Sequence, residues 1–367
     1  MIKKIVLVIT IILLLVGFAT LIYFYTLYRQ SYVGDKGIQT PQPTIVKPTP
    51  TPDPLAPKNV LLLGYAGPGH DGPTLTDTMI VAHVEPREKR VSLISIPRDI
   101  WVPIPIKGDE EKNFKLNHAF AIGSDDRSYL LKKDEYKGLV GGGNMAKDAV
   151  SKVIGMPIDY FVSINFDSFT RIINILGGIE VVVPYTLDDE FYPIKGEEDN
   201  TCEKTEEEIK VITATISGEK LEQEFKCRFE HVHIDTGRQL LDSETALKFV
   251  RSRHSSIGGG DFGRSQRQQA FIKAIKDRLL SLGSITKIIP FVTTLSKNVQ
   301  TDINIKNAFD LYRQLGEIED IKIISISLST DNVLKEDISE DRQFILVASE
   351  GEGWESVHKY INKELIK

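Results

Sequence analysis

The strongest constraint on the fold comes from short apolar runs of strand length, separated by turn residues and by helix-length patterns. Three of these runs, each rich in Val, Ile and Leu, come early in the chain: residues 60–64, 79–84 and 91–96. Farther along, residues 166–176 repeat apolar positions with a helical period, between strand-like residues 159–164 and 179–183. This alternation predicts a layered α/β/α sandwich around a mixed β-sheet, and the last three segments predict a β-α-β unit.

The rest of the chain extends this pattern without a repeat or a second linker. Helices are expected at residues 145–154, 284–297, 305–315 and 354–366, and strands at 321–328 and 344–347. Residues 141–144, three glycines and an asparagine, are expected to form the entry to the first helix. They lack the Gly-Lys-Ser/Thr ending of a phosphate loop. The chain has 367 residues, 41% of them hydrophobic, so it can bury a sizeable core, and residues 59–367 are predicted to form one domain.

Residues 1–30 are predicted to be a cytoplasmic N-terminus and a single transmembrane anchor. Lys3 and Lys4 precede residues 5–27, which hold no charged side chain and are long enough to cross a bilayer. The two lysines before this run, against Arg29 after it, favour a cytoplasmic N-terminus and an extracytoplasmic domain. A cleaved signal peptide is the alternative, but its apolar region is normally shorter and ends in small residues.

Residues 31–58 are predicted to be a linker. They hold seven prolines among Thr and Gly, a composition that forms no helix. Such segments are extended and semi-rigid, so this one would hold the following domain away from the membrane surface.

An acidic insertion is predicted at about residues 186–231. Its first part, residues 188–210, carries ten carboxylates against three lysines. Cys202 and Cys227, the only cysteines of the chain, lie within it, and a disulfide between them is expected outside the cytoplasm. A zinc site is not favoured, because these cysteines and the nearby His231 and His233 lack a paired C-x-x-C spacing. Both histidines are expected to be structural.

The most informative polar segment covers residues 251–268, RSRHSSIGGGDFGRSQRQ. It places four arginines, four glycines and Asp261 within eighteen positions of a chain whose formal net charge is -6. Arg251, Arg253 and Arg264 each offer a planar fork that fits two phosphate oxygens, and the glycines let the backbone approach a ligand closely. From Arg264 onward the pattern predicts a helix, which places Gln268 one turn later. The segment therefore predicts a phosphate or diphosphate site.

A simpler interpretation is that these arginines form a solvated face at the start of a helix. This interpretation is favoured for Arg267 alone, because nothing requires it to share the face of Arg264. For the whole segment, with glycines and Asp261 between two arginine pairs, a phosphate site is favoured.

Two further candidates lie at strand ends. Asp77 lies just before the start of the second predicted strand. Arg98 follows shortly after the end of the third, before Asp99. Ligands gather at strand ends in α/β sheets, so both are candidates for the site of the later arginines, although each could be an ordinary turn residue. A carboxylate among phosphates also suits Mg²⁺, which binds one or two carboxylates together with phosphate oxygens.

Several linked segments, in order and at appropriate distances, resemble the LytR-CpsA-Psr (LCP) family over most of residues 59–303. They are LLLG, TDTMIVAHVEPREKRVSLISIPRD, KLNHAF, DYFVSINFDSFTRIINILGGIEV and LDSETALKFVRSRHSSIGGGDFGRSQRQQAFIKAI. Members of this family are membrane-anchored extracytoplasmic phosphotransferases. They move glycopolymers such as teichoic acids from an undecaprenyl-pyrophosphate carrier onto peptidoglycan, with Mg²⁺ assisting.

The resemblance implies roles for particular residues. Asp77 would hold the metal, and Arg98 the pyrophosphate, with Asp77, Arg98 and Asp261 as the catalytic set. The phosphate groups would be bound by the remaining basic and amide side chains: Lys115, Arg251, Arg253, Arg264 and Gln268. Many members carry an acidic residue where this chain has Tyr65, so metal binding here would rest on fewer carboxylates.

The residues suit phosphoryl transfer without the family resemblance, since that reaction needs positioning and charge neutralisation more than covalent catalysis. The acceptor would be a sugar hydroxyl, and Asp77 or Asp99 would take its proton. A polyprenyl-pyrophosphate hydrolase and a non-catalytic module that binds lipid-linked glycan are the alternatives. No nucleic-acid partner is expected, because the net charge is negative and the basic cluster is small.

Overall fold

The computed structural model describes residues 53, 55–70, 72–281, 299–315, 320–351 and 353–367. The predicted membrane anchor, nearly all of the predicted linker and the helix expected at residues 284–297 lie outside these residues. Among the described helices, none combines the length and the apolar character needed to cross a bilayer.

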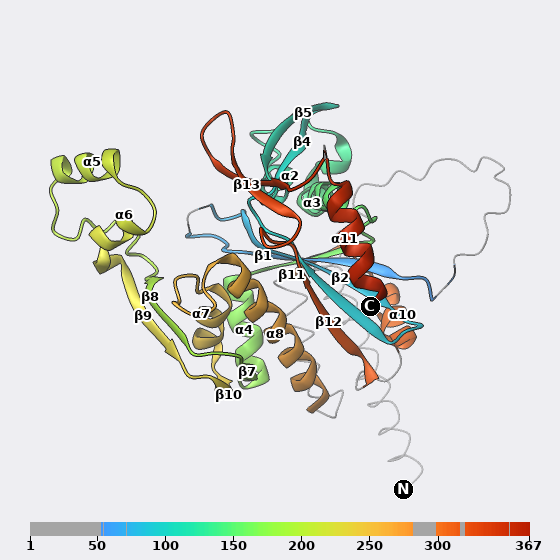
Figure 1. Cartoon of the computed structure of the whole chain (residues 1–367). Coiled ribbons are helices and arrows are strands. Elements are labelled where there is room, and N and C mark those ends of the chain that lie inside the picture. The colour runs from blue at the N-terminus through green and yellow to red at the C-terminus, as the bar shows by residue number, and fades with distance from the viewer. Residues whose placement is uncertain (1–52, 54, 71, 282–298, 316–319, 352) are drawn as a thin grey trace, which may run out of the picture.

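A six-stranded mixed sheet forms the centre of the molecule (Figure 1). In spatial order its strands are β11 (Val299–Thr301), β6 (Tyr160–Asn165), β1 (Lys58–Tyr65), β2 (Thr76–Glu85), β3 (Arg90–Ser95) and β12 (Lys322–Ser327). The β1–β6 and β3–β12 pairs are parallel, whereas β1–β2, β2–β3 and β6–β11 are antiparallel. The predicted mixed sheet is therefore confirmed.

Helices cover both faces of this sheet (Figure 1). One face packs against α2 (His118–Ser124), α3 (Gly141–Ile154) and α11 (Glu355–Ile366) around a large apolar core. The opposite side carries α4 (Phe166–Leu176), α7 (Ser243–Arg251) and α8 (Gly260–Ser281), which share a second core. The remaining helical elements are α5 (Glu206–Thr215), α6 (Glu219–Glu224), α10 (Ile305–Leu315), η1 (Asp134–Tyr136), η2 (Gly138–Val140) and η3 (Lys226–Arg228).

The alternation of side chains along the central strands decides what faces each layer. Leu61 and Leu63 of β1 lie in the core beside α3, whereas Leu62 faces the other side and lines a cavity there. On β2, Met79 belongs to the same core, and Ile80 lines the cavity. Because strand side chains point to alternate faces, each strand supplies both a core and a cavity wall.

The predicted β-α-β unit is wrong in its last strand. β6 and α4 form where expected, but β7 (Ile179–Val183) does not join the central sheet. It pairs with β10 (Gly237–Leu241) and packs its buried side chains against α8. Three further two-stranded sheets are β4 (Trp101–Lys107) with β5 (Glu110–Lys115), β13 (Leu334–Ile338) with β14 (Phe344–Ala348), and β8 (Leu187–Pro193) with β9 (Phe229–Ile234).

The three glycines expected before α3 instead form its first turn, after Val140 at the N-cap, and Asn144 does not cap the helix. Their small size allows close packing. A Cβ atom on Gly143 would lie 2.2 Å from the Phe161 ring, and one on Gly141 would lie 2.3 Å from the Tyr136 carbonyl oxygen. These residues therefore bring α3 against β6 and η1 and have no phosphate-binding geometry of their own.

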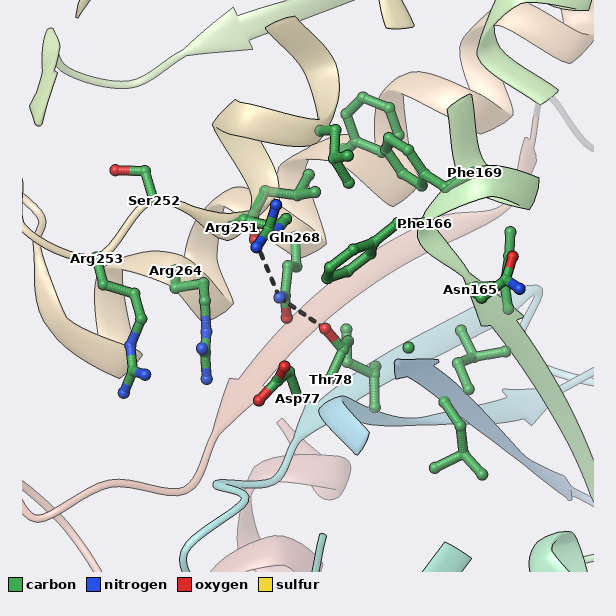
Figure 2. Close-up of a pocket in the computed structure, with 18 of the residues that line it drawn as sticks. Asp77, Thr78, Asn165, Phe166, Phe169, Arg251, Ser252, Arg253, Arg264 and Gln268 are labelled. Carbon is green, nitrogen blue, oxygen red and sulfur yellow. Dashed lines mark hydrogen bonds between the residues drawn. The ribbon is translucent and has the colours of Figure 1, made fainter. Parts of the chain in front are cut away.

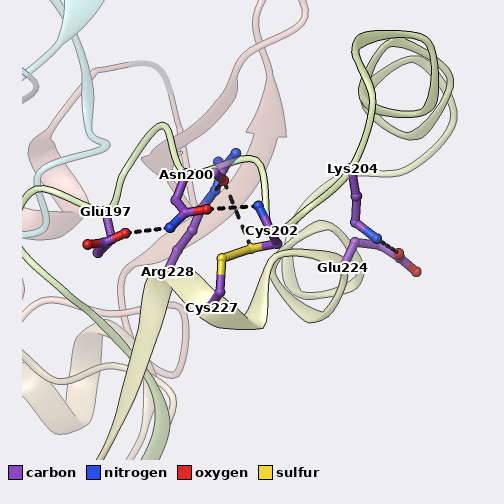
Figure 3. The surroundings of a disulfide bond; sticks show 7 residues. All are labelled: Glu197, Asn200, Cys202, Lys204, Glu224, Cys227 and Arg228. Carbon is purple, nitrogen blue, oxygen red and sulfur yellow. Dashed lines mark hydrogen bonds and ion pairs between the residues drawn. A yellow bond between two sulfur atoms is a disulfide. The ribbon is translucent and has the colours of Figure 1, made fainter.

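The predicted insertion is a two-stranded ribbon, β8–β9, with α5 and α6 at its outer end, and it projects from the domain (Figure 1). A disulfide joins Cys202 and Cys227 across 25 residues of chain (Figure 3). Nearby, the Nε atom of Arg228 donates to the Asn200 carbonyl oxygen at 2.7 Å. The described part of the insertion is therefore held together by covalent and polar contacts as well as by its short helices.

Candidate functional site

A cavity of about 470 Å³ lies between the central sheet and helices α4, α7 and α8. One end is apolar and the other is charged. The apolar end is lined by Leu62, Ile80, Val162, Ile164, Phe169, Leu247, Phe271, Ile272, Ile275 and Val299. The charged end is lined by Asp77, Arg98, Arg251, Arg253 and Arg264; Figure 2 labels Asp77 and the last three arginines. The structure therefore brings six of the eight predicted site residues, these five and Gln268, to one cavity.

The arginine segment folds as the end of one helix, a turn and the start of the next. Asp242 caps α7 by accepting from the Thr245 backbone N–H at 2.7 Å, and α7 ends at Arg251. Helix α8 begins at Gly260, four residues earlier than the sequence pattern predicted, so Asp261 lies in its first turn. A Cβ atom on Gly263 would lie 1.7 Å from the Gly258 carbonyl oxygen, so this turn requires glycine.

Asp261 holds two arginines together. Its Oδ1 atom lies 2.7 Å from a terminal nitrogen of Arg253 and 2.9 Å from one of Arg264. Burial alone would raise the pKa of Asp261, but Arg264, Arg253 and Arg98 lower it below its ordinary value. Burial lowers the pKa of Arg264 to about 10, against the opposing effect of Asp261. Arg264 therefore stays charged at neutral pH, and Figure 2 shows Arg253 and Arg264 extending side by side toward Asp77.

Asp77 and Arg98 form an ion pair at the ends of β2 and β3. Burial would lower the pKa of Arg98, but Asp77 and Asp99 raise it. The Nε atom of Arg98 is buried and makes no hydrogen bond to any described residue; the nearest Asp99 carboxylate oxygen is 3.5 Å away. Arg98 therefore lies between two carboxylates at the cavity wall, and its positive charge there suits an anionic ligand.

Lys115 lies behind the cavity. It ends β5, and its ammonium group donates to Oδ1 of Asp99 at 2.7 Å. Asp99 is buried and in turn approaches Arg98, so the three side chains form a chain that leads to the cavity. Lys115 does not line the cavity, so its placement does not support the predicted direct contact with phosphate.

Arg251 lies against aromatic side chains at the cavity wall. Its guanidinium carbon is 4.2 Å from the centre of the Phe166 ring and 5.3 Å from that of Tyr192. It also donates to the Tyr192 hydroxyl at 2.8 Å. Stacking on aromatic rings holds the planar group in place without neutralising it.

Gln268 and Arg267 connect the elements around the site. The Gln268 amide donates to the Thr78 hydroxyl at 2.8 Å and to the Val250 carbonyl oxygen at 3.2 Å (Figure 2). Arg267 is buried and donates to the Phe249, Ser252 and Gly258 carbonyl oxygens. The interpretation of Arg267 as a solvated residue is therefore wrong: it holds the C-terminal end of α7 and the glycine turn against α8.

The structure also shows cavity residues that sequence reasoning missed. His254 follows Arg253, and its Nε2 atom lies 3.3 Å from a carboxylate oxygen of Glu222, which belongs to α6 of the insertion. Both line the cavity. His254 stands in the arginine segment and could have been selected by its position. Nothing in the sequence distinguishes Glu222 from the other carboxylates of the insertion.

A second cavity of about 280 Å³ adjoins the first. The two share Asp77, Thr78, Arg264 and Gln268, and Asp261 lines the second one. Asp77 and Arg264 therefore lie at the junction of the two cavities, the first of which has the apolar end. A group bound at this junction would be accessible from both cavities.

A divalent cation would find Asp77 at this junction as its carboxylate ligand, together with oxygens of a bound phosphate, and this donor set fits Mg²⁺. Tyr65 supplies no ligand, because it turns toward α2 and packs against Phe120, with ring centres 5.3 Å apart. Burial raises the pKa of Tyr65, so its hydroxyl stays neutral. Asp99 is buried beside Lys115 and does not line either cavity.

Comparison with known proteins agrees with this architecture. The curated teichoic acid transferase TagU of Enterococcus faecalis, named a polyisoprenyl-teichoic acid–peptidoglycan transferase, is 29% identical over 77% of this chain and 75% of its own length. The fold is similar to that of protein gbs0355 from Streptococcus agalactiae (TM-score 0.58, 23% identity, 85% of this chain and 88% of that one). It is also similar to B. subtilis TagV (TM-score 0.55, 24% identity, 85% and 98%). The family model described as LytR_cpsA_psr matches residues 23–349, and the chain therefore belongs to the LytR_cpsA_psr family.

Proposed function

We propose that this protein is a phosphotransferase that moves a glycopolymer from a polyprenyl-pyrophosphate carrier onto a sugar hydroxyl of peptidoglycan. The observation that supports it is a single cavity with a cluster of arginines at one end and a long apolar lining at the other. A polyprenyl diphosphate likewise has a charged head, the diphosphate, joined to a long apolar chain. The named activity of the related transferases agrees with this substrate class.

The diphosphate would lie at the charged end, between Arg98, Arg253 and Arg264. Asp261 holds the last two arginines side by side, and Arg98 lines the same cavity. Arg251, held by its aromatic neighbours, would contact the phosphate nearer the lipid. Fixed cations of this kind stabilise the charge that spreads over the phosphoryl oxygens in the transition state.

The acceptor hydroxyl would attack the phosphorus that bears the glycan. A new oxygen–phosphorus bond forms, the bond to the bridging oxygen breaks, and the carrier leaves as a polyprenyl monophosphate. Asp77 lines both cavities, so it is placed to accept the proton of a hydroxyl that enters from the second cavity. Mg²⁺ held by Asp77 and the phosphates would neutralise part of the charge on the leaving group.

We further propose that residues 5–27 anchor the protein in the cell membrane and that residues 31–58 place the domain outside the cytoplasm. The sequence pattern supports this. Protease treatment of intact cells should cleave the domain while leaving the N-terminus protected. Protection of both ends would contradict this topology.

The reaction can be tested with the full-length chain in lipid vesicles, a polyprenyl-pyrophosphate-linked glycan and a peptidoglycan oligomer. Transfer gives polyprenyl monophosphate together with glycan linked to the oligomer through phosphate. Release of polyprenyl monophosphate without linkage would show a hydrolase instead. Saturable binding of the lipid with no product at all, with or without Mg²⁺, would show a non-catalytic binding module.

A further inference from the structure

Three exposed side chains converge on one face of the β8–β9 ribbon, outside the cavities described above. The antiparallel register pairs Asp188 of β8 with His233 of β9. His231 lies two residues before His233, so both histidines point to the same face of the strand. The Oδ1 atom of Asp188 is 2.6 Å from Nε2 of His231 and 3.0 Å from Nδ1 of His233.

We propose that Asp188, His231 and His233 form a Zn²⁺ site. Two imidazole nitrogens and one carboxylate oxygen are a donor set that zinc accepts when water fills the fourth position. The three ligand atoms lie within 4.8 Å of one another. Bonds of about 2.0–2.1 Å in a tetrahedral site place neighbouring ligand atoms roughly 3.3 Å apart. Small rotations of these exposed side chains would therefore admit the ion.

A fourth residue supports this arrangement from outside the triad. Nε2 of His233 lies 3.3 Å from Oδ1 of Asp235, on the side of the ring away from Asp188. Zinc-binding histidines commonly donate their second N–H to a carboxylate, which fixes the ring and leaves the other nitrogen for the metal.

The position of the site in the ribbon indicates what the metal would do. Asp189, the residue after Asp188, is buried and accepts from Ser252 Oγ at 2.5 Å and from the Arg253 backbone N–H at 3.1 Å. A metal that joins β8 to β9 would therefore hold the strand that supports the arginine segment. The disulfide secures the outer part of the same insertion.

The sequence alone did not favour zinc because the cysteines and these histidines lack a paired C-x-x-C spacing. Asp188, 43 residues before His231, is brought beside the histidines only by strand pairing. The cysteines, which sequence patterns would pair with these histidines, are joined to each other instead.

The test is a zinc titration of the untagged full-length chain, measured by calorimetry. The chain is kept in detergent micelles and is stripped of metal beforehand. We expect one zinc ion per chain, and no measurable binding by His231→Ala or His233→Ala. Asp235→Asn should weaken binding by about tenfold. His358→Ala, which removes a histidine of α11, is the matched control and should bind zinc as the unmodified chain does.

Cobalt provides a second measurement, because its absorption spectrum distinguishes a four-coordinate site with nitrogen ligands from loose surface binding. Circular dichroism of each variant should match that of the unmodified chain, since all three side chains are exposed. Absence of zinc binding by the unmodified chain, or unchanged binding by both histidine variants, would overturn the proposal.

Discussion

The two ends of the main cavity are built in different ways. The charged end collects side chains from the end of β2, the loop after β3, the loop after α7 and the first turns of α8, and each is held by a named partner. The apolar end is lined by ordinary strand and helix residues such as Ile80 and Ile272, whose neighbours on the same elements fill the cores. The fixed charges would therefore set the position of the anionic group of a ligand. The apolar side chains would set how much of its apolar part fits in the cavity.

The largest expected effect on the transfer rate comes from removing a fixed charge at the charged end of the cavity. Arg98→Ala should lower the rate of transfer by roughly 10²–10³-fold, the usual cost of losing one group that stabilises transition-state charge. Binding of the lipid tail should persist. Product formation is followed in vesicles, with Arg238→Ala as a control, because Arg238 is exposed, does not line the cavity and forms an ion pair with Glu180. Equal loss of tail binding and rate would mean that the two ends do not act separately.

A change at the apolar end should give the opposite pattern. Ile272→Asp places a carboxylate in the lining. Covering it with a lipid costs more than the roughly 1–3 kcal/mol of a neutral polar group, so affinity should fall by at least about tenfold. The KM for a long polyprenyl substrate should rise, whereas that for a short-chain analogue should change little. Leu240→Asp, at an exposed apolar residue outside the cavity, is the control. An equal effect on both substrates would show that the lipid lies elsewhere.

A smaller effect is expected from changing the shape of a cation without changing its charge. Arg253→Lys keeps the positive charge but loses the planar fork, which contacts Asp261 and would contact a phosphate in the proposed complex. We expect about a tenfold lower rate, since a charge-assisted hydrogen bond contributes about 1.5 kcal/mol. A rate equal to that of the unmodified protein would mean that Arg253 acts only as a point charge.

The smallest effect on transfer is expected at the insertion. Replacing both cysteines, Cys202→Ser with Cys227→Ser, should remove about 3 kcal/mol of loop stabilisation from the insertion alone. Amide hydrogen exchange in α5 and α6 should then accelerate, while exchange in α8 stays the same. The rate should fall less than in Arg253→Lys, because Glu222 is the one residue of α5 and α6 that lines the cavity. A larger fall would show that the insertion helps to form the charged end.

This contrast also explains how much the sequence could predict. Arg98, Arg253 and Arg264 were identifiable because charged residues next to glycines or strand ends have few structural uses. The apolar lining could not be identified, because Leu61 and Leu62 look alike in sequence and only the face of the strand to which each points separates core from cavity. Five of the six central strands were predicted from their apolar runs. The short β11 and the position of β7 were not, because their pairing depends on contacts distant in sequence. The same limit concealed Glu222 and the pairing of Asp188 with His233.

Helix α8 carries Asp261 and Arg264 at one end and Ile272 and Ile275 farther along, so one rigid rod spans both parts of the proposed substrate. At a rise of about 1.5 Å per residue, Arg264 and Ile275 are roughly 16 Å apart along its axis. That distance would set how many isoprene units, counted from the diphosphate, lie within the protein. The remainder of a long carrier would stay in the bilayer while its head group reacts.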